Sequence, residues 1–373
     1  MKPDRIPFYQ PYVSEEIYDA VREVLERGRQ TGSFTVSEET TRFEKAFADY
    51  NNIKHAISMN SCTAALHAAL MAYGIGKGDE VIVPSLTFIA TFEAVWFVGA
   101  RPVVVDVDPK YYVMDVEQAI SEISRKTKAI IPVHLYGHPV DMDPIMEAAK
   151  KKDIVVIEDN AQAPGGRYKE RMLGTIGSVG CFSFHPQKNI TTLGDGGLLT
   201  TNDDEIAEKV MMIRDHGRRR GENPYSHEVL GHNFRMGEMK AAIGRVALSH
   251  LDDWNRRRRE IAARYRKALN LNTVTTPEEA SWAYHVYHLY VVRCANRDKL
   301  KNYLRTQNIM TEVHYPIPCH KQKVFEKLER EAISLPISER LAGEILSLPM
   351  FPELTDDKVD YVVSKVKEFY DQQ

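Results

Sequence analysis

The sequence predicts an α/β protein, in which a large domain built on a mostly parallel sheet of about seven strands flanked by helices is followed by a smaller α+β domain. Short runs rich in valine and isoleucine recur between residues 55 and about 203, and most are apolar throughout, as is typical of strands buried on both faces of a sheet. Helical stretches separate several of these runs. The length of 373 residues favours a large domain with a smaller companion over one compact unit.

The expected strands follow one another along the first half of the chain. Helices are expected between them, for example in TAALHAALMAYGI after the first run and in IATFEAVWFVGA after the second. Beyond residue 205 the strands become rare and helix signals dominate, through LDDWNRRRREIAARYRKALN. The seven strand predictions are residues 55–59, 80–87, 102–108, 128–136, 153–158, 180–184 and 197–201.

This change of pattern indicates where the domains divide. We expect a large domain over residues 1–254 and a small α+β domain over residues 255–373, with the hinge near 254–270 and with N-terminal residues packing on the small domain. No linker rich in proline, glycine or serine and no internal repeat marks the boundary. The small domain would contain YHVYHLYVVR as a strand, a helix at 297–307, the proline-rich HYPIPCH and a closing helix from about residue 356.

Composition excludes several classes of protein. Hydrophobic residues make up 43% and charged residues 27%, and no window approaches the ~20 consecutive apolar residues that span a bilayer, so no membrane insertion is expected. Lysine and arginine number 49 against 52 acidic residues, which gives no general attraction to nucleic acid. The N-terminus shows no apolar leader and the four cysteines are scattered without paired spacing, so we expect a cytoplasmic protein.

Polar and aromatic residues follow the ends of the first two strands, where an open α/β sheet binds its ligands. In MNSCTAALHAAL, Asn60, Ser61 and Thr63 precede a helix whose first N–H groups and positive partial charge could hold an anion. Plain N-capping by Ser61 or Thr63 is the alternative, and this segment alone favours it. Phe88 follows the second strand, where its ring could cover a flat ligand, although in isolation a core position is the better interpretation.

A carboxylate and a lysine follow two later strands. In VVIEDNAQAPGG, the acidic pair Glu158 and Asp159 lies where a buried strand ends, and buried carboxylates need partners; a loop cap or an arginine would satisfy them structurally. The sixth strand, in GCFSFHPQKNITTLGDGG, presents Ser183, His185 and Lys188 before a glycine-rich turn. Twenty-nine residues separate Asp159 from Lys188, enough for a parallel crossover, so both side chains can lie at one edge of the sheet.

Pyridoxal 5′-phosphate needs four protein groups: a lysine, a carboxylate, a helix N-terminus that binds its phosphate, and an aromatic ring that covers its own ring. The lysine amine forms a Schiff base with the aldehyde and later moves a proton. The carboxylate keeps the pyridine nitrogen protonated. At ~4 Å and an effective dielectric constant near 20 this pair is worth about 4 kcal/mol, which is roughly three pKa units. The ring is then cationic at neutral pH and accepts electrons readily.

The chain resembles, nearly end to end, the DegT/StrS-type sugar aminotransferases, which are fold type I pyridoxal-phosphate enzymes. The resemblance implies transfer of an amino group from an amino acid, with L-glutamate as the expected donor, to a nucleotide-linked 3- or 4-keto sugar by ping-pong chemistry. Such reactions make amino sugars for surface polysaccharides or secondary metabolites. The segments that carry the resemblance are MNSCTAALHAAL, PSLTFIAT, VVVDVDPKYYVMD, VHLYGHPVDM, IEDNAQAPGGRYKERMLGTIG, FSFHPQKNITTLGDGG, GHNFRMGEMKAAIGRVAL and VHYPIPCH.

The resemblance also implies roles for single residues. Lys188 would form the Schiff base and Asp159 would pair with the pyridine nitrogen. Gln162 would reach the ring hydroxyl, and Phe88 would stack on the ring. Family members build each active site across a homodimer, so a neighbouring subunit would contribute to the phosphate site. The residues expected around the phosphate are Ser61, Cys62, Thr63, Ser183 and, from the neighbouring subunit, Asn233.

Two positions depart from the family pattern. Cys62 stands where the family commonly has glycine, and we expect a small thiol to be tolerated there because the glycine permits close approach rather than a positive φ. His185 stands where the family often has tyrosine. A basic loop over residues 218–220 could bind the diphosphate of a nucleotide sugar, and a loop that only contacts solvent is equally favoured. The segment HYPIPCH could contact the substrate at the mouth of the site, and the alternative is a purely structural proline-rich loop. The candidate substrate residues are His185, Arg219, His314, Tyr315 and His320.

Other functions remain as alternatives. The family includes members first described as regulators, so a cofactor-bearing regulatory or sensory protein is one, and a related sugar dehydratase or cyclitol aminotransferase is another. The dehydratase branch carries histidine in place of the lysine, so Lys188 argues against it. A dinucleotide oxidoreductase is disfavoured because no GxGxxG follows the first strand. His134 and His138 lack a third metal ligand, so no metal site is expected.

Overall fold

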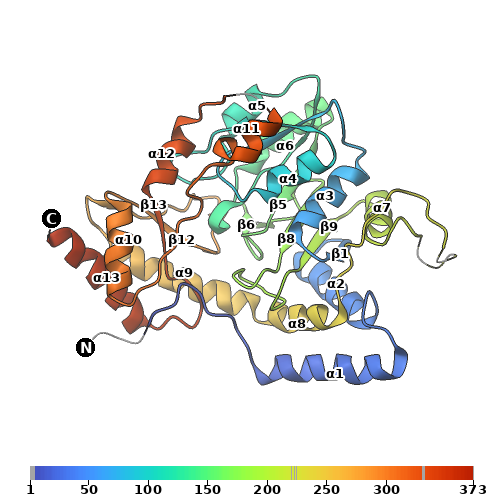
Figure 1. The fold of residues 1–373 in the computed structure, drawn as a ribbon, viewed down its shortest axis with the longest axis horizontal. Coiled ribbons are helices and arrows are strands. Elements are labelled where there is room, and N and C mark those ends of the chain that lie inside the picture. Colours follow the sequence, from blue (N-terminus) through green and yellow to red (C-terminus); the bar gives the residue numbers. More distant parts are fainter. Residues whose placement is uncertain (1–4, 220, 222, 224, 330–331, 373) are drawn as a thin grey trace.

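The structure is a computed structural model that describes residues 5–372 except 220, 222, 224, 330 and 331. Its centre is a seven-stranded sheet with helices on both faces (Figure 1). The strand order is β1-β9-β8-β5-β4-β2-β3; β9 is antiparallel to both of its neighbours and the other adjacent pairs are parallel, which confirms the predicted fold class. The strands are β1 (His55–Met59), β2 (Glu80–Pro84), β3 (Arg101–Val105), β4 (Thr127–Ile130), β5 (Val155–Asp159), β8 (Val179–Ser183) and β9 (Gly197–Thr201).

Three of these strands end earlier than the apolar runs that predicted them. β2 ends at Pro84 instead of residue 87, β3 ends at Val105 instead of residue 108, and β4 ends at Ile130 instead of residue 136. After β4 the chain turns through a short 3-10 helix, η1 (Leu135–Gly137), in which Tyr136 has a φ of 58°. An apolar run can continue past a strand because the turn that follows is itself buried, as these residues are.

The strands are buried on both faces, as their composition predicts. Along β2, Val81 and Val83 pack on one side of the sheet and Ile82 packs on the other, which is the two-residue alternation of a β-strand. The first side is covered by α3 (Cys62–Ala72), α4 (Ala90–Phe97) and α7 (Asp204–Arg214), and the second by α5 (Val116–Ser121) and α6 (Met142–Lys152).

Aromatic side chains of β8 and of the residue that follows it pack against a further layer of helices. Phe43 and Phe47 pack edge to face against Phe184, and Phe47 also contacts Phe182 with ring centroids 4.9 Å apart. α1 packs on α8 through a small apolar cluster (Figure 1). These helices are α1 (Glu15–Thr31), α2 (Glu38–Asn51) and α8 (Glu238–Ser249).

The last hundred residues form a second, antiparallel sheet with its own core. Helices α9, α10 and α13 pack on it, and the predicted helices at 297–307 and from residue 356 are both present. The N-terminal segment joins this core, because the Ile6 amide donates to the Asn308 carbonyl at 2.8 Å and the Met310 amide donates to the Ile6 carbonyl at 3.0 Å. The elements are β10 (Val274–Thr275), β12 (Tyr290–Cys294), β13 (Ile345–Leu348), α9 (Leu251–Ala268), α10 (Arg297–Thr306) and α13 (Asp356–Asp371).

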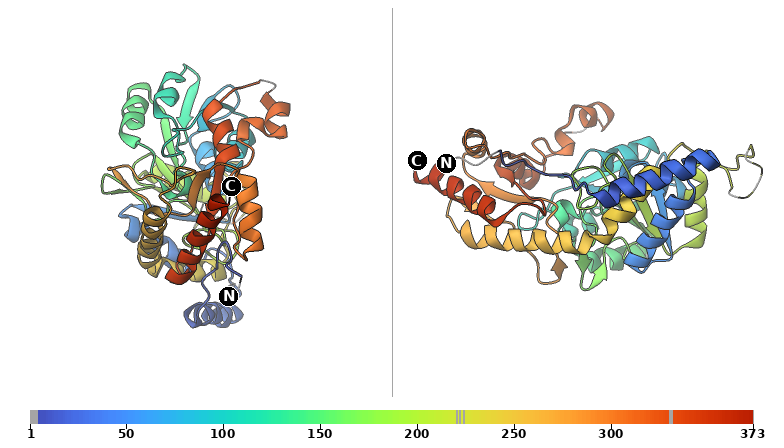
Figure 2. Two further views of the ribbon diagram at one scale, coloured as in Figure 1. Left: turned by 90° about the vertical axis from the view of Figure 1, so that its left-hand side faces the viewer. Right: turned by 90° about the horizontal axis from the view of Figure 1, so that it is seen from below.

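The expected boundary between residues 254 and 255 lies inside α9, which continues unbroken from the α8 side of the molecule to the side where α10 and α13 lie (Figure 2). A third small sheet, in the order β11-β6-β7, also pairs residues on either side of this boundary. We retain the two-domain division as a proposal, with α9 as the connecting element. The remaining elements are β6 (Arg167–Tyr168), β7 (Arg171–Met172), β11 (Ala283–Tyr284), η2 (Cys319–Lys321), α11 (Lys323–Glu329) and α12 (Pro336–Glu344).

Among the residues that the structure describes, no helix combines the length and the apolar character needed to cross a bilayer.

Candidate active site

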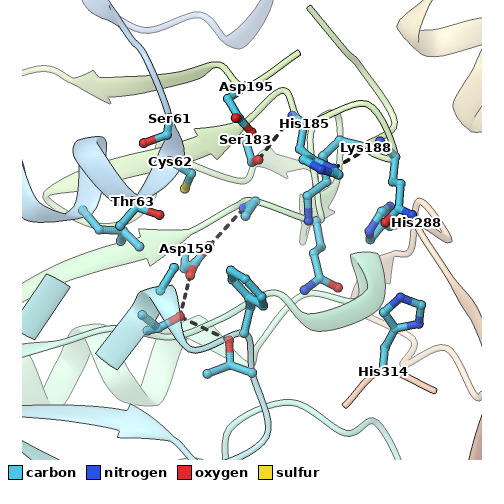
Figure 3. A pocket seen from close by; sticks show the side chains of 18 of the residues that line it. Ser61, Cys62, Thr63, Asp159, Ser183, His185, Lys188, Asp195, His288 and His314 are labelled. Atoms are coloured by element: carbon cyan, nitrogen blue, oxygen red, sulfur yellow. Dashed lines mark hydrogen bonds between the residues drawn. The ribbon is translucent and has the colours of Figure 1, made fainter. Parts of the chain in front are cut away.

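A cavity of about 380 Å³ opens where β1, β2, β5 and β8 end (Figure 3). This is the edge of the sheet at which the sequence placed its candidate residues, and the cavity volume falls in the usual range for small-molecule sites. It also draws residues from the C-terminal part of the chain. The sequence-predicted residues that line it are Ser61, Cys62, Thr63, Phe88, Asp159, Gln162, Ser183, His185, Lys188, His314 and Tyr315.

The first turn of α3 forms one corner of the cavity. Ser61 caps the helix, since its hydroxyl accepts a hydrogen bond from the Ala64 amide at 3.1 Å. Gly197 of β9 lies against this corner so closely that a Cβ atom built on it would be 2.2 Å from the Ser61 carbonyl carbon. The capping interpretation is therefore correct for Ser61, and the helix still points its positive end into the cavity.

Cys62 tolerates its position for the reason that the sequence suggested. It is the first residue of α3, and its φ is not positive. The side chain is buried, which raises the pKa of the thiol well above its ordinary value, and the nearby Asp159 and Cys181 raise it further. The thiol of Cys62 is therefore neutral.

Asp159 ends β5 and is 4% exposed. Its Oδ1 accepts from the Ala161 amide at 3.1 Å, and its Oδ2 accepts from the Thr91 hydroxyl at 3.0 Å. No lysine, arginine or histidine in the described part of the chain lies within ion-pair distance of it, and burial raises its pKa. Asp159 is thus a buried carboxylate oriented by two neutral donors and without a cationic partner of its own.

The neighbouring carboxylate has a different role. Glu158 is fully buried and accepts hydrogen bonds from three backbone amides, those of Gly174, Ile176 and Gly177, at 2.7–2.9 Å. Its Oε2 also lies 3.2 Å from His134 Nε2. The loop-capping alternative considered for the acidic pair therefore applies to Glu158, and Asp159 is the one that faces the cavity.

Lys188 reaches the cavity from the loop after β8. Its backbone amide donates to the His185 carbonyl at 2.8 Å, which closes a turn and directs the side chain inward (Figure 3). Burial lowers the pKa of its amine to about 8, against the partly opposing effect of the Asp159 charge. A much larger fraction of this amine is neutral near pH 7 than for an ordinary lysine, and a neutral amine is the nucleophilic form.

Another part of the cavity wall is formed by Gln162, Phe88 and Tyr315. Gln162 Oε1 accepts from the Tyr136 amide at 2.9 Å, and its Nε2 donates to the Tyr315 hydroxyl at 3.1 Å. The rings of Phe88 and Tyr315 have centroids 6.0 Å apart. Phe88 is 57% exposed, so the core position favoured for it in isolation is wrong and its ring is available at the cavity.

Two histidines line the mouth of the cavity. His185 is exposed, and its Nδ1 lies 3.4 Å from the Gln187 amide. His314 is anchored, with Nδ1 3.0 Å from the Ser347 hydroxyl, while its carbonyl accepts from the Tyr136 hydroxyl. Burial, with the charge of Lys188, lowers the pKa of His314 to about 4, so its imidazole is neutral at physiological pH.

Asn233 and Arg219 do not line the cavity of their own chain. Arg219 forms a paired contact with Glu228, at 3.0 Å from each of two nitrogens, and a further ion pair with Glu208. These contacts engage its guanidinium with Glu228 of the same loop and with Glu208 of α7, in place of the diphosphate contact predicted for it. Asn233 is exposed and pairs through its backbone with Asp215. The third arginine of the basic loop, at position 220, lies outside the described residues.

His320 also lies outside the cavity lining. It is 3% exposed, its Nδ1 is 2.6 Å from the Ser85 hydroxyl, and its Nε2 is 3.1 Å from Glu339 Oε1. Both ring nitrogens are therefore occupied. The proline-rich loop interpretation fits His320 better than the predicted substrate contact, because the residue links this loop to the end of β2.

Sequence reasoning missed Thr91, Asp195 and His288, which all line the cavity. Thr91 could have been found, because it lies one helical turn after Thr87 and a short distance past the strand end that drew attention to Phe88. His288 carried no usable signal, since it belongs to a β-like stretch of the C-terminal part. Asp195 sits in the glycine-rich turn itself.

The two histidines spaced by four residues serve the loop after β4. His134 contacts Glu158 and accepts from the Val140 amide at 3.0 Å; His138 contacts the Pro139 carbonyl at 2.7 Å and accepts from the Ala280 amide at 3.1 Å. No group of three or more histidine, cysteine, aspartate or glutamate residues suited to a metal ion occurs among the described residues.

Comparison with known proteins agrees with this geometry. The chain is 44% identical to a pleiotropic regulatory protein of Geobacillus stearothermophilus, over 95% of this chain and 96% of that protein. It is 40% identical to dTDP-3-amino-3,4,6-trideoxy-alpha-D-glucose transaminase of Streptomyces venezuelae, over 98% and 96% of the two chains. A crystal structure of S. venezuelae DesV in complex with a ketimine intermediate superimposes with a TM-score of 0.93 at 40% identity, covering 98% of this chain and 99% of that one. The model of the DegT/DnrJ/EryC1/StrS aminotransferase family matches residues 11–367, and the chain therefore belongs to that family.

Proposed function

We propose that the chain is a pyridoxal-phosphate-dependent aminotransferase that moves an amino group from an amino acid, L-glutamate in the first instance, to a nucleotide-linked 3- or 4-keto sugar. The family and its solved members are pyridoxal-phosphate-dependent aminotransferases. The observation that carries the proposal is one cavity holding both a lysine whose pKa is about 8 and a buried carboxylate with no cationic partner among the described residues.

The residues of the cavity fit this cofactor part by part. The carboxylate of Asp159 suits a protonated ring nitrogen, because a buried anion gains most from a cation at close range. The Nε2 group of Gln162 is a donor for the ring hydroxyl, and the exposed ring of Phe88 can cover a flat heterocycle. The helix corner suits the phosphate, with Ser61, Cys62, Thr63 and Ser183 around it.

Bound pyridoxal phosphate would supply an aldehyde that condenses with amines and a ring that accepts electrons. The protein supplies the rest. Lys188 attacks a carbonyl in its neutral form, of which about one part in ten is present at pH 7 for a pKa of about 8. Once released, the same amine can carry a proton between two carbon atoms within reach of it. One lysine thus serves both half-reactions of a ping-pong cycle.

For the substrates, the supporting residues are those at the mouth of the cavity. His185, His314 and Tyr315 offer ring nitrogens and a hydroxyl that can bind sugar hydroxyls or the donor's carboxylate. Neutral His314 can act as donor or acceptor without adding charge. The related S. venezuelae protein acts, according to its name, on a dTDP-linked amino sugar, which supports a nucleotide sugar as acceptor here.

The colour of the purified protein tests the proposal. We expect a yellow protein whose visible band disappears with borohydride, with borohydride fixing the cofactor to Lys188, and which bleaches when glutamate is added. Lys188→Ala should lack the band, whereas Lys209→Ala, which removes a surface lysine paired with Glu205, should keep it. A protein that stays colourless after incubation with pyridoxal phosphate contradicts the proposal.

The acceptor is identified by a panel of nucleotide-linked keto sugars. After glutamate has bleached the protein, the correct keto sugar should restore the visible band, because it removes the amino group from the cofactor. UDP-, GDP- and dTDP-linked sugars with the carbonyl at carbon three or carbon four should be compared. If another amino acid bleaches the band and glutamate does not, only the donor assignment changes.

A second candidate is a regulatory protein that holds the same cofactor, and the name of the Geobacillus relative favours it. A sensor would bind pyridoxal phosphate without turning over keto sugars. The presence of Lys188, Asp159 and Ser183 together in one cavity supports catalysis over sensing. Steady-state production of glutamate's keto acid in the presence of a keto sugar separates the two.

We also propose a homodimer with shared active sites and a location in a reducing cytoplasm. The dimer is supported by the family and by Asn233, which is exposed and lies outside the cavity of its own chain. The reducing compartment is supported by Cys62, Cys181, Cys294 and Cys319, which are all free and buried thiols.

A further inference from the structure

A serine, a histidine and a carboxylate form a hydrogen-bonded chain that the proposed chemistry leaves unused. The Ser85 hydroxyl lies 2.6 Å from Nδ1 of His320, and Nε2 of the same ring lies 3.1 Å from Oε1 of Glu339. The order of the groups is that of a nucleophilic triad. Ser85 is 0% exposed, however, so no substrate reaches its hydroxyl. Any function of this chain must therefore come from the segments that it joins.

The hydrogen bonds of this chain run in one direction. The bonds that Glu339 accepts, above all the one from His320, lower the pKa of Glu339 to about 2, so its carboxylate is ionised. Burial lowers the pKa of His320 although Glu339 opposes the shift, so the imidazole is neutral at physiological pH. Its single ring hydrogen lies on Nε2, toward the carboxylate. The lone pair on Nδ1 therefore accepts from the Ser85 hydroxyl.

The serine end of the chain joins two stretches of the cavity wall. One stretch runs from Ser85 to Phe88, and the other runs back from His320 to Tyr315. The rings of Phe88 and Tyr315 both line the cavity, with centroids 6.0 Å apart. Beside the contact between Ser85 and His320, the Cys319 amide donates to the Ser85 carbonyl at 2.9 Å. The two stretches thus meet at Ser85, three residues before the aromatic ring of the first.

Both ends of the chain are anchored to the central sheet. Ser85 directly follows the last residue of β2, and Asp106 directly follows the last residue of β3, the strand that pairs with β2. Asp106 accepts hydrogen bonds from two backbone amides in the first turn of α12, at 2.9 and 2.8 Å, and Glu339 belongs to the same helix. His320 is therefore held between two points of one sheet, and its flat ring is a rigid spacer between them.

We propose that His320 is a positioning residue, and that its bond with Ser85 keeps the loop of Tyr315 in place against the part of the cavity that covers the cofactor ring. The inference rests on the function proposed above. Tyr315 also accepts from Gln162 Nε2 at 3.1 Å, so a shift of this loop would move both the aromatic wall and the amide expected at the ring hydroxyl. Loss of the Ser85 bond would weaken these contacts with the cofactor and leave Lys188 in place.

The two ring nitrogens of His320 can be tested separately by substitution. In His320→Asn the amide oxygen can stand near the position of Nδ1 and accept from Ser85. In His320→Gln the longer side chain can reach Glu339 but leaves the Ser85 hydroxyl without this acceptor. The bonds of Cys319 to the carbonyls of Ser85 and Thr87, at 2.9 and 3.3 Å, remain in both variants, so we expect both to fold.

The probe is pyridoxamine 5′-phosphate, which has no aldehyde and therefore binds without joining Lys188. Its dissociation constant is measured by calorimetry on full-length protein freed of cofactor. We expect His320→Gln to bind it about threefold or more weakly than the wild type does, as for the loss of one hydrogen bond, and His320→Asn to bind it as the wild type does. Equal affinity of His320→Gln and the wild type, or equal weakness of the two variants, overturns the proposal.

Ser85→Ala is the second variant and covers the case in which His320→Gln does not fold. It should weaken binding of pyridoxamine phosphate as much as His320→Gln does. The double variant should bind no more weakly than either single one, because all three lack the same bond. Wild-type affinity in Ser85→Ala, or losses that add up in the double variant, overturns the proposal.

Hydrogen exchange in cofactor-free protein gives a measurement that needs no ligand. The peptide that contains the Cys319 amide should exchange faster in Ser85→Ala than in the wild type and in His320→Asn, and an unchanged rate in Ser85→Ala overturns the inference. A wild-type protein that binds no pyridoxamine phosphate and never turns yellow overturns the proposed function instead. The exchange rates then still decide whether His320 holds this loop.

Discussion

At the scale of single residues, Asp159 illustrates how burial gives a common side chain an uncommon property. Two neutral donors, Ala161 N–H and Thr91 O–H, orient its carboxylate, and burial raises its pKa although these hydrogen bonds and the charge of Lys188 oppose the shift. A cationic ring bound beside it would reverse that balance. The buried charge of Asp159 therefore destabilises the protein without cofactor, and it would stabilise the protein with a cationic ring bound.

Asp159→Asn should abolish most of the activity while leaving the fold intact. The amide keeps the shape and can still bond to Thr91, but it cannot stabilise a cation, and a pair worth about 4 kcal/mol corresponds to roughly a 10³-fold loss of rate. Stopped-flow measurement of bleaching by glutamate checks it. The control is Asp153→Asn, at a left-handed position that asparagine also tolerates. Near-normal bleaching in Asp159→Asn would show that the carboxylate charge is not used.

Lys188 makes a prediction about pH. Its folded-state pKa of about 8 lies below that of an ordinary lysine, so the neutral amine increases as pH rises and dominates above pH 8. The rate at which cofactor-free protein binds pyridoxal phosphate should rise about tenfold from pH 6 to pH 7 and level off above pH 8, as followed by the visible band. A rate that is still rising steeply at pH 10 would indicate an unshifted lysine.

At the scale of secondary-structure elements, the corner between β9 and α3 is the tightest part of the site. Gly197 of β9 leaves no room for a Cβ atom, which would lie 2.2 Å from the backbone of Ser61. The strand therefore sets the position of the helix start, and through it the N–H groups expected to bind phosphate. A glycine here serves close approach, and the neighbouring Cys62 can carry a side chain because it points elsewhere, into the cavity lining.

Gly197→Ala should weaken both stability and cofactor binding. The added methyl group must push α3 away from β9, and overpacking of this kind costs about 1–3 kcal/mol. Gly343→Ala is the matched control, because Gly343 lies in α12 with nothing within 4 Å of a Cβ atom, and alanine there should be neutral or slightly stabilising. Urea unfolding and a titration with pyridoxal phosphate measure the two effects. An unaffected Gly197→Ala protein would mean that the corner can relax.

At the scale of the whole molecule, the site combines distant parts of the chain. β1, β2, β5 and β8 supply the cofactor side, while His288, His314 and Tyr315 come from the part beyond α9 (Figures 1 and 3). The proposed dimer would add a third contributor through Asn233.

The shared site can be tested by mixing two defective chains. Lys188→Ala and Asn233→Ala, each of low activity alone, should recover about a quarter of wild-type activity when they are co-expressed, because half of the dimers are mixed and each mixed dimer has one complete site. Activity is measured on the unfractionated mixture, and the mixed species purified with two different tags should then show about half of wild-type activity. A fully active Asn233→Ala protein, or no recovery in the mixture, would show that each chain completes its own site.

The seven strands of the central sheet could be predicted from the sequence alone, because apolar β-branched runs have few ways to be buried other than in the middle of a sheet. The sequence also determined that Asp159 and Lys188 share one sheet edge, because parallel topology places strand ends together. Three outcomes could be seen only in the folded chain: Glu158 caps a loop, His320 is bound on both nitrogens, and Arg219 forms an ion pair with Glu208 of α7. The tertiary structure alone brought Thr91 and His288 into the site. These outcomes depend on which segments pack together over long distances in the chain, and neither spacing nor composition encodes that packing locally.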